Sequence, residues 1–186
     1  MIEKAYGQLE EGHYEEAIEA FSDCLLLEPG EARGYYGRGI AHLRLKKWGA
    51  AVLDFQKAKE LNPENLEGWV ALAMSLAADN KIYEAIEVFE GLLARNPQYV
   101  RGHIQLARLY YRLGIIAKGH KQLDTALCSR PSLPERKLIE ELKNEQLALD
   151  KRRYYRPDFE ALHQQERDRP PGFLNRMRNL WKKQSR

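Results

Sequence analysis

Prolines recur at a constant interval of 34 residues, at Pro29, Pro63, Pro97 and Pro131. Two further columns keep the same interval. A small residue lies twelve positions before each proline, at Ala17, Ala51, Ala85 and Gly119. A large apolar residue lies one helical turn after each small residue, at Phe21, Phe55, Phe89 and Leu123. A fixed period of this length indicates stacked units, each of which buries its apolar side against its neighbours.

Each unit contains two segments of helical length. In the third unit, apolar residues with helical spacing occur at Trp69, Leu72, Ala73 and Leu76, and then at Ala85, Ile86, Phe89, Leu92 and Leu93. Turn signals separate the two segments, at Glu11-Gly12, Lys46-Lys47, Asp79-Asn80 and Leu113-Gly114. Small residues let paired helices approach to about 8–10 Å, and proline ends each second helix. The pattern predicts an all-α chain of helix pairs.

This pattern resembles the tetratricopeptide repeat (TPR) family over residues 1–131. The second and third units match best, through Tyr35, Gly39, Trp48, Ala51, Phe55, Ala58, Pro63, Trp69, Leu72, Ala73, Ala85, Phe89 and Pro97. The fourth unit departs from the family at His103, Gly119 and Leu123, and the first is short because Met1 falls inside its first helix. The resemblance implies a right-handed superhelical solenoid of about four helix-turn-helix units. The short start leaves open that the chain is an excised domain.

Residues 132–155 are expected to form a helix that caps the last repeat. Ser132 and Glu135 have the spacing of a capping box, and Pro134 suits the first turn of a helix. The residues expected to cover the fourth repeat are Leu138, Ile139, Leu142 and Leu149.

Residues that could carry chemistry do not cluster. Cys24 and Cys128 lie in the first and fourth units, too far apart for a disulfide, and Cys24 is expected in the core. The five histidines, His13, His42, His103, His120 and His163, share no column with carboxylates or thiols. The chain has no CxxC or HExxH pattern. We therefore expect no enzyme activity, no metal site and no cofactor.

The resemblance implies that the first helices line a concave groove. The positions carried over are Tyr6, Leu9, Glu10, Arg33, Tyr36, Ile40, Leu43, Arg44, Glu67, Val70, Met74, Ala77, Arg101, Ile104, Arg108, Tyr111 and Arg112. Exposed apolar residues on such a surface favour a ligand, and arginine adds recognition of carboxylates. We expect a protein or peptide with apolar anchors and acidic residues. The alternative is a solvated groove without a dedicated ligand.

TPR domains that hold the acidic C-termini of heat-shock chaperones use Lys, Asn and Arg on successive first helices. The matching positions here are Ile2, Tyr6, Gly37, Glu67 and Ala71, or, one repeat later, Tyr36, Ile40, Ala71, Arg101 and Gln105. Neither set supplies this clamp, so a cochaperone function is not expected.

The charge is distributed unevenly. Residues 151–186 carry 11 Lys and Arg and 4 Asp and Glu, whereas residues 1–150 carry 19 and 23. Within the basic extension 156–186, the segment 173–183 has an apolar helical face, formed by Phe173, Leu174, Met177, Leu180 and Trp181. Its basic residues are Arg176, Arg178, Lys182 and Lys183.

Three interpretations of this extension stay open. The first is that it lies on an anionic membrane surface. The second is that it docks on a partner or in the chain's own groove, and the third is that it is a solubilising end. Nucleic acid is a weaker candidate because the repeats are net acidic.

The sequence therefore predicts a scaffold or adaptor that binds a protein partner in the groove. The alternative is a peripheral membrane-associated assembly factor anchored by the extension. No segment approaches the roughly 20 apolar residues of a membrane-spanning helix, and the N-terminus has no signal-peptide pattern. A cytoplasmic location, or one peripheral to a membrane, is expected, and end-to-end self-association is plausible for an uncapped first unit.

Overall fold

The computed structural model describes residues 1–153, which form helices joined by short connections. The helices of this part are α1 (Ile2–Glu11), α2 (Tyr14–Leu27), α3 (Ala32–Arg44), α4 (Trp48–Leu61), α5 (Leu66–Ala78), α6 (Ile82–Arg95), α7 (Val100–Arg112), α8 (Ile116–Cys128) and α9 (Leu133–Arg153). The prediction of an all-α chain of helix pairs is confirmed.

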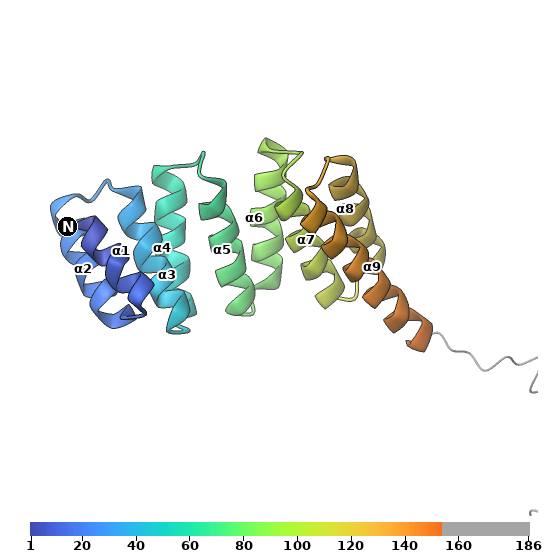
Figure 1. The fold of residues 1–186 in the computed structure, drawn as a ribbon, viewed down its shortest axis with the longest axis horizontal. Helices are drawn as coiled ribbons and strands as arrows, with labels where there is room; N and C mark the ends of the chain where they lie inside the picture. The colour runs from blue at the N-terminus through green and yellow to red at the C-terminus, as the bar shows by residue number, and fades with distance from the viewer. Residues whose placement is uncertain (154–186) are drawn as a thin grey trace, which may run out of the picture. The chain divides into compact units, whose positions relative to one another are not determined.

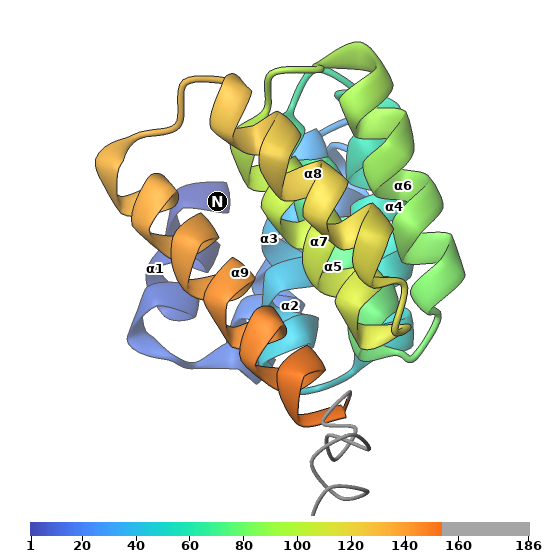
Figure 2. The same cartoon turned by 90° about the vertical axis from the view of Figure 1, so that its right-hand side faces the viewer.

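The helices from α1 to α8 pack in the order of the chain (Figure 1). Each odd-numbered helix packs against the even-numbered helix that follows it, which makes four antiparallel pairs. The first helices of successive pairs also touch, α1 with α3 and α3 with α5. Viewed along the row of repeats, α3, α5 and α7 overlap in the centre, and α4 and α6 lie to one side of them (Figure 2). This arrangement places equivalent residues of neighbouring repeats next to one another.

The turn inside each pair has the same backbone conformation in all four repeats. One residue lies in the left-handed region, at Gly12, Lys46, Asn80 and Gly114. The amide that follows it then bonds to a carbonyl five residues back, as from Lys47 N to His42 O at 2.9 Å. This pattern satisfies carbonyls at the end of the first helix. The four predicted turns are therefore confirmed.

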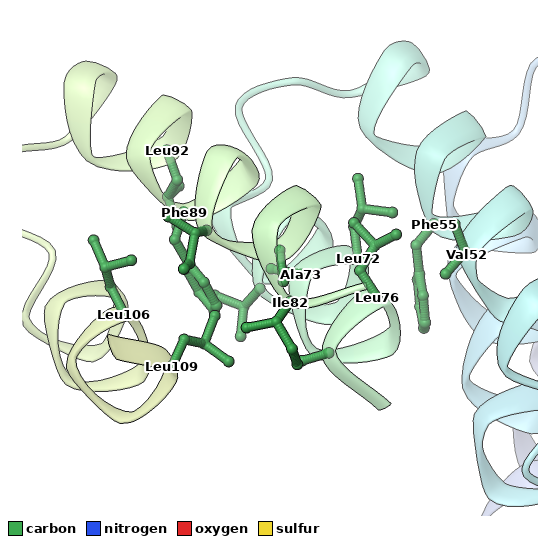
Figure 3. Close-up of a cluster of buried hydrophobic side chains, with 14 of the residues drawn as sticks. Val52, Phe55, Leu72, Ala73, Leu76, Ile82, Phe89, Leu92, Leu106 and Leu109 are labelled. Carbon is green, nitrogen blue, oxygen red and sulfur yellow. The ribbon is translucent and has the colours of Figure 1, made fainter. Parts of the chain in front are cut away.

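The core follows the predicted columns. Phe21, Phe55 and Phe89 are each fully buried, and the small residues Ala17, Ala51 and Ala85 lie in the same clusters. The largest cluster runs from α4 to α7, and Figure 3 shows its side chains meeting between successive helices. A smaller cluster joins α1, α2 and α3 through Ala5, Ala17, Phe21 and Ala41. The middle of the chain thus holds most of the buried apolar surface.

Helix α9 begins as expected and covers the fourth repeat with its first turns. Glu135 accepts hydrogen bonds from the Ser132 amide at 2.8 Å and from its hydroxyl at 2.7 Å. Ile139 is fully buried against α7 and α8, with Leu138 and Leu142 packed around it. Leu149 is 54 % exposed, so the prediction that it joins this contact is wrong. Leu149 keeps the helical spacing, two turns after Leu142, so the spacing alone does not reveal its exposure.

Several expectations concern residues outside the described part of the chain. These are the basic extension 156–186 and its amphipathic segment 173–183. Within residues 1–153, Cys24 is buried in the core as expected, Cys128 is exposed, and both are free thiols. No helix in the same range is both long and apolar enough to cross a bilayer.

Candidate peptide-binding surface

The outward-facing side chains of α1, α3, α5 and α7 form one continuous set, here called the A-helix surface. Because the repeat period is 34 residues, equivalent positions adjoin on neighbouring helices. The first row is Tyr6, Ile40, Met74 and Arg108, and the second is Glu10, Arg44, Ala78 and Arg112. In these rows only Tyr6 and Ile40 are partly buried, and Met74 is 42 % exposed. The surface therefore offers apolar side chains that border exposed arginines.

Tyr6 and Tyr36 of this surface are fixed by the cores beneath them. Tyr6 packs edge-to-face on Phe21, and its hydroxyl donates to the Arg33 carbonyl oxygen at 2.8 Å. Tyr36 packs against Phe55, with ring centroids 5.6 Å apart. Burial raises the pKa of both phenols, so they remain neutral hydrogen-bonding groups at physiological pH. Rigid aromatic side chains of this kind lose little entropy when they bind a ligand.

The aliphatic residues predicted for the groove divide into two classes. Leu9, Ile40 and Leu43 are partly buried and pack on the cores with one side. Val70 is 4 % exposed, Ala77 is 7 % exposed and Ile104 is 2 % exposed. The prediction that these three residues face a ligand is wrong. Val70 belongs to the central cluster, and Ile104 lies in the cluster that α9 covers with Ile139.

Two of the five predicted arginines are already paired with glutamates. Arg33 Nη2 lies 2.9 Å from Glu3 Oε1, and its guanidinium lies over the Tyr6 ring. Arg101 Nη1 donates to both carboxylate oxygens of Glu67, at 3.0 and 2.9 Å. The Tyr99 hydroxyl donates to the same carboxylate at 3.0 Å. Burial and then this hydrogen bond raise the pKa of Tyr99 to about 12.

A third arginine has a structural partner. Arg112 Nη1 donates to the Ala77 carbonyl oxygen at 3.0 Å, and Nη2 donates to Asn80 Oδ1 at 3.4 Å. It therefore caps the C-terminal end of α5 from the next repeat. Tyr111 beside it is hydrogen-bonded to His120 Nδ1 at 3.0 Å and lies against the backbone of Gly119. Both residues hold α7 in place, and no sequence pattern distinguishes them from ligand-binding residues.

Arg44 and Arg108 remain exposed, and neither has an ion-pair or hydrogen-bond partner within residues 1–153. Arg108 shares its row with Met74 and Ile40, and Arg44 occupies the adjoining row. A guanidinium without an acidic partner is available to bind a carboxylate with two hydrogen bonds. The A-helix surface therefore combines apolar contact area with two unused cationic groups.

Comparison with protein families assigns the repeat. The family described as tetratricopeptide repeat matches residues 2–65 and again residues 66–109. The chain belongs to the tetratricopeptide repeat family. The two matches cover α1 to most of α7, and the fold extends the TPR packing through α8.

Similar proteins share this fold. The crystal structure of MamA superimposes with a TM-score of 0.65 at 22 % identity, over 69 % of this chain and 75 % of that one. The first TPR domain of Spaghetti (RPAP3), bound to an HSP90 peptide, superimposes with a TM-score of 0.56 at 25 % identity. The superposition covers 60 % of this chain and 89 % of that one. Sperm-associated antigen 1 of Rattus norvegicus is 33 % identical over 86 residues, 46 % of this TPR chain. That match spans only 10 % of the relative's length.

Proposed function

We propose that this TPR protein is an adaptor whose A-helix surface binds an acidic peptide segment with apolar anchors. The observation that carries the proposal is that Arg44 and Arg108 are exposed beside Ile40 and Met74 and have no acidic partner among the described residues. The other arginines of the surface are held by Glu3, Glu67 or a helix end and would have to give up those bonds. Two charge-assisted hydrogen-bonding sites next to apolar surface favour a ligand of mixed acidic and apolar character.

The relatives support a peptide ligand in general terms. The RPAP3 domain was determined with the HSP90 peptide SRMEEVD, which combines methionine and valine with two glutamates. A second RPAP3 domain was determined with an HSP70 peptide. The clamp residues expected for such chaperone tails are replaced here, with Gly37 and Ala71 at two of the positions. The proposed ligand is therefore an acidic-apolar segment that needs no free C-terminal carboxylate.

The test is a selection of random peptides on the full chain, followed by affinity measurements. We expect the selected peptides to be enriched in Asp and Glu together with Leu, Met or aromatic residues. The variant Arg44→Glu/Arg108→Glu should weaken their binding at least tenfold, because a charge-assisted hydrogen bond contributes about 1.5–3 kcal/mol. The control variant Arg136→Glu/Lys137→Glu makes the same charge change on exposed positions of α9 and should bind normally.

Selected peptides without acidic residues, or equal binding by both charge variants, would refute the proposal. Thermal melting of each variant establishes that it is folded. Binding should also weaken as salt is raised, since the arginines are exposed and their charges are screened.

A further inference from the structure

A cleft lies at the C-terminal end of α2, where the connection to the second repeat begins. Its walls come from the start of α1, from α2 and from this connection. The lining residues are Met1, Ile2, Cys24, Leu27, Glu28 and Glu31. The cleft has a volume of about 220 Å³. A cavity of about 150 Å³ holds benzene, so this cleft has room for one aromatic or long aliphatic side chain.

The cleft is bordered by uncovered apolar side chains. Leu27 is 68 % exposed, and its neighbour Leu26 is 80 % exposed. Cys24 is only 8 % exposed, and its free thiol lines the cleft without a hydrogen-bond partner among the described residues. The fold does not require the two leucines, since the third repeat has Ala94 and Arg95 at the same positions. Exposed apolar side chains beside a cleft therefore indicate a binding site.

A row of carboxylates leads along α2 to this cleft. Glu15, Glu19, Asp23 and then Leu27 follow one another at a constant spacing of four residues, and all four are exposed. None of the three carboxylates has an ion-pair or hydrogen-bond partner among the described residues. Like charges four residues apart on a helix repel one another. The second and fourth repeats have no acidic residue in this row, so the helix packing does not require it.

The charge around the cleft has one sign. The side chains of residues 1–31 include nine Asp and Glu and one basic residue, Lys4. Glu28 is the C-cap of α2, and a carboxylate is unfavourable at this end of the helix dipole. Its side chain has no ion-pair or hydrogen-bond partner among the described residues. A ligand that supplies positive charge relieves both this unfavourable position and the repulsion along the row.

The spacing of the row fits an extended ligand. Residues four apart on a helix lie about 6 Å apart along its axis. Alternate residues of an extended chain point to one side about 6.6–6.8 Å apart. An extended segment with a basic residue at every second position therefore places its charges beside Asp23, Glu19 and Glu15 in turn. An apolar side chain two residues further along such a segment reaches the cleft beside Leu27.

We propose that the cleft and the carboxylate row of α2 bind an extended basic segment of a partner protein. One large apolar side chain of that segment fills the cleft beside Leu27, and its alternate lysines or arginines pair with Asp23, Glu19 and Glu15. This site lies on α2, apart from the A-helix surface, whose proposed ligand is acidic. An adaptor with both sites connects two partners of opposite charge.

Fluorescence anisotropy with labelled peptides on the full chain tests the site. The probe is the peptide WSKSKSKS, which has one apolar anchor and alternate lysines. We expect ASKSKSKS, which lacks the anchor, to bind at least fivefold more weakly, and the acidic peptide WSESESES to bind at least tenfold more weakly. Glu19→Lys/Asp23→Lys should weaken binding of the probe at least tenfold, and Leu27→Gln at least fivefold. Both variants change exposed side chains, and thermal melting establishes that they are folded.

Matched controls change the same residue types at exposed positions elsewhere. Glu84→Lys/Glu87→Lys on α6 and Leu53→Gln on α4 should bind the probe normally. The variant Arg44→Glu/Arg108→Glu should also bind it normally, which separates this site from the proposed peptide-binding function.

The two cysteines report directly on occupancy. Cys24 lines the cleft, whereas Cys128 is exposed on α8 and serves as the internal reference. Saturating probe should slow alkylation of Cys24 by iodoacetamide at least threefold and leave Cys128 unchanged, with the rates read by mass spectrometry. Leu27→Gln should remove most of this protection.

Equal binding of WSKSKSKS and ASKSKSKS would overturn the proposal, because the cleft would then have no occupant. Equal weakening by the α2 and α6 charge variants would also overturn it, since the attraction would then depend on net charge alone. Alkylation of Cys24 that slows as the protein alone is concentrated would place a second copy in the cleft and would overturn the assignment to a partner.

Discussion

The second and third repeats have the same backbone but fill their cores in opposite ways. At three positions the second repeat has polar residues, Arg38, His42 and Asp54, where the third has Leu72, Leu76 and Val88. The polar set lies at the contact between the first and second repeats, and the apolar set lies in the central cluster. The comparison shows that the first interface adds directional polar bonds to a small apolar cluster, whereas the next interface relies on apolar packing.

The polar set is closely bonded. Asp54 is 5 % exposed and accepts from Arg38 Nε at 3.0 Å and from Nη2 at 2.7 Å. Arg38 Nη1 also donates to Ser22 Oγ of α2 at 3.1 Å. A buried ion pair adds little net stability relative to apolar packing, because both charges lose their hydration. The cluster of the first repeat has only four buried residues, one of them Ala41 of α3, so we expect the first repeat to unfold most readily.

The largest expected loss of stability distinguishes the central cluster from the first repeat. Phe89→Ala removes a fully buried ring from the central cluster and should cost about 3–5 kcal/mol in the free energy of unfolding. Phe21→Ala removes an equally buried ring from the first repeat, which can unfold while the others stay folded. We expect a smaller loss, below about 3 kcal/mol, in urea unfolding followed by circular dichroism.

Hydrogen exchange locates the effect of each phenylalanine substitution. In Phe21→Ala, protection should fall in α1 and α2 and persist in α5 and α6. Equal losses of stability, with protection falling in all helices together, would show that the four repeats unfold as one unit and would remove the distinction between the two regions.

The next effect concerns the buried ion pair. Asp54→Val leaves the Arg38 guanidinium without its carboxylate and should cost about 2–3 kcal/mol, toward the low end for a buried pair because the Arg38 side chain is 23 % exposed. The double variant Arg38→Leu/Asp54→Val installs the residues of the third repeat and should recover most of that loss. Urea unfolding of the four members of this cycle measures both. A double variant as unstable as Asp54→Val would show that the pair contributes net stability.

A smaller effect depends on pH. Burial lowers the pKa of His42, and the positive charges of Arg38 and Lys47 lower it further. The Asp54 carboxylate, 3.7 Å from the His42 ring, raises this pKa but does not outweigh burial. As the pH falls, the unfolded chain therefore binds a proton at His42 at a higher pH than the folded chain does. Stability is full above about pH 6.5 and falls below it, with a slope of at most about 1.4 kcal/mol per pH unit. In His42→Gln, the free energy of unfolding measured in urea should depend less on pH between pH 7 and about 5.5. An unchanged pH dependence would contradict this account.

The sequence predicted the repeat period, the helix pairs and the turns because these depend on residue columns that all four repeats share. It did not predict which surface positions would be covered. Val70 and Ile104 occupy the column of Tyr36, where a short side chain is buried by the next helix and only the longer tyrosine reaches solvent. Arg101 is ion-paired with Glu67 of the preceding repeat, and Arg112 donates a hydrogen bond to the Ala77 carbonyl oxygen of that repeat. Such bonds depend on the spacing between repeats.

The smallest expected effect returns to the second and third repeats, at their inner turns. Lys46 and Asn80 both adopt positive φ, 59° and 64°, where the first and fourth repeats have glycine. A side chain other than Asn or Gly in this region costs roughly 1 kcal/mol, because its Cβ crowds the backbone. Lys46→Gly should therefore stabilise the chain by about 0.5–1 kcal/mol, and Asn80→Gly by less.

Gly114→Ala supplies the reverse test of this backbone argument. A Cβ at Gly114 would meet no atom within 4 Å outside its own chain neighbours, so any loss reports the backbone alone. We expect a loss of about 1 kcal/mol in thermal or urea unfolding. A stabilised Gly114→Ala, or a Lys46→Gly no more stable than the parent, would mean that the entropy glycine adds to the unfolded chain outweighs the relieved crowding. In that case the turns of the second and third repeats do not differ in strain, and what distinguishes these repeats lies in their cores.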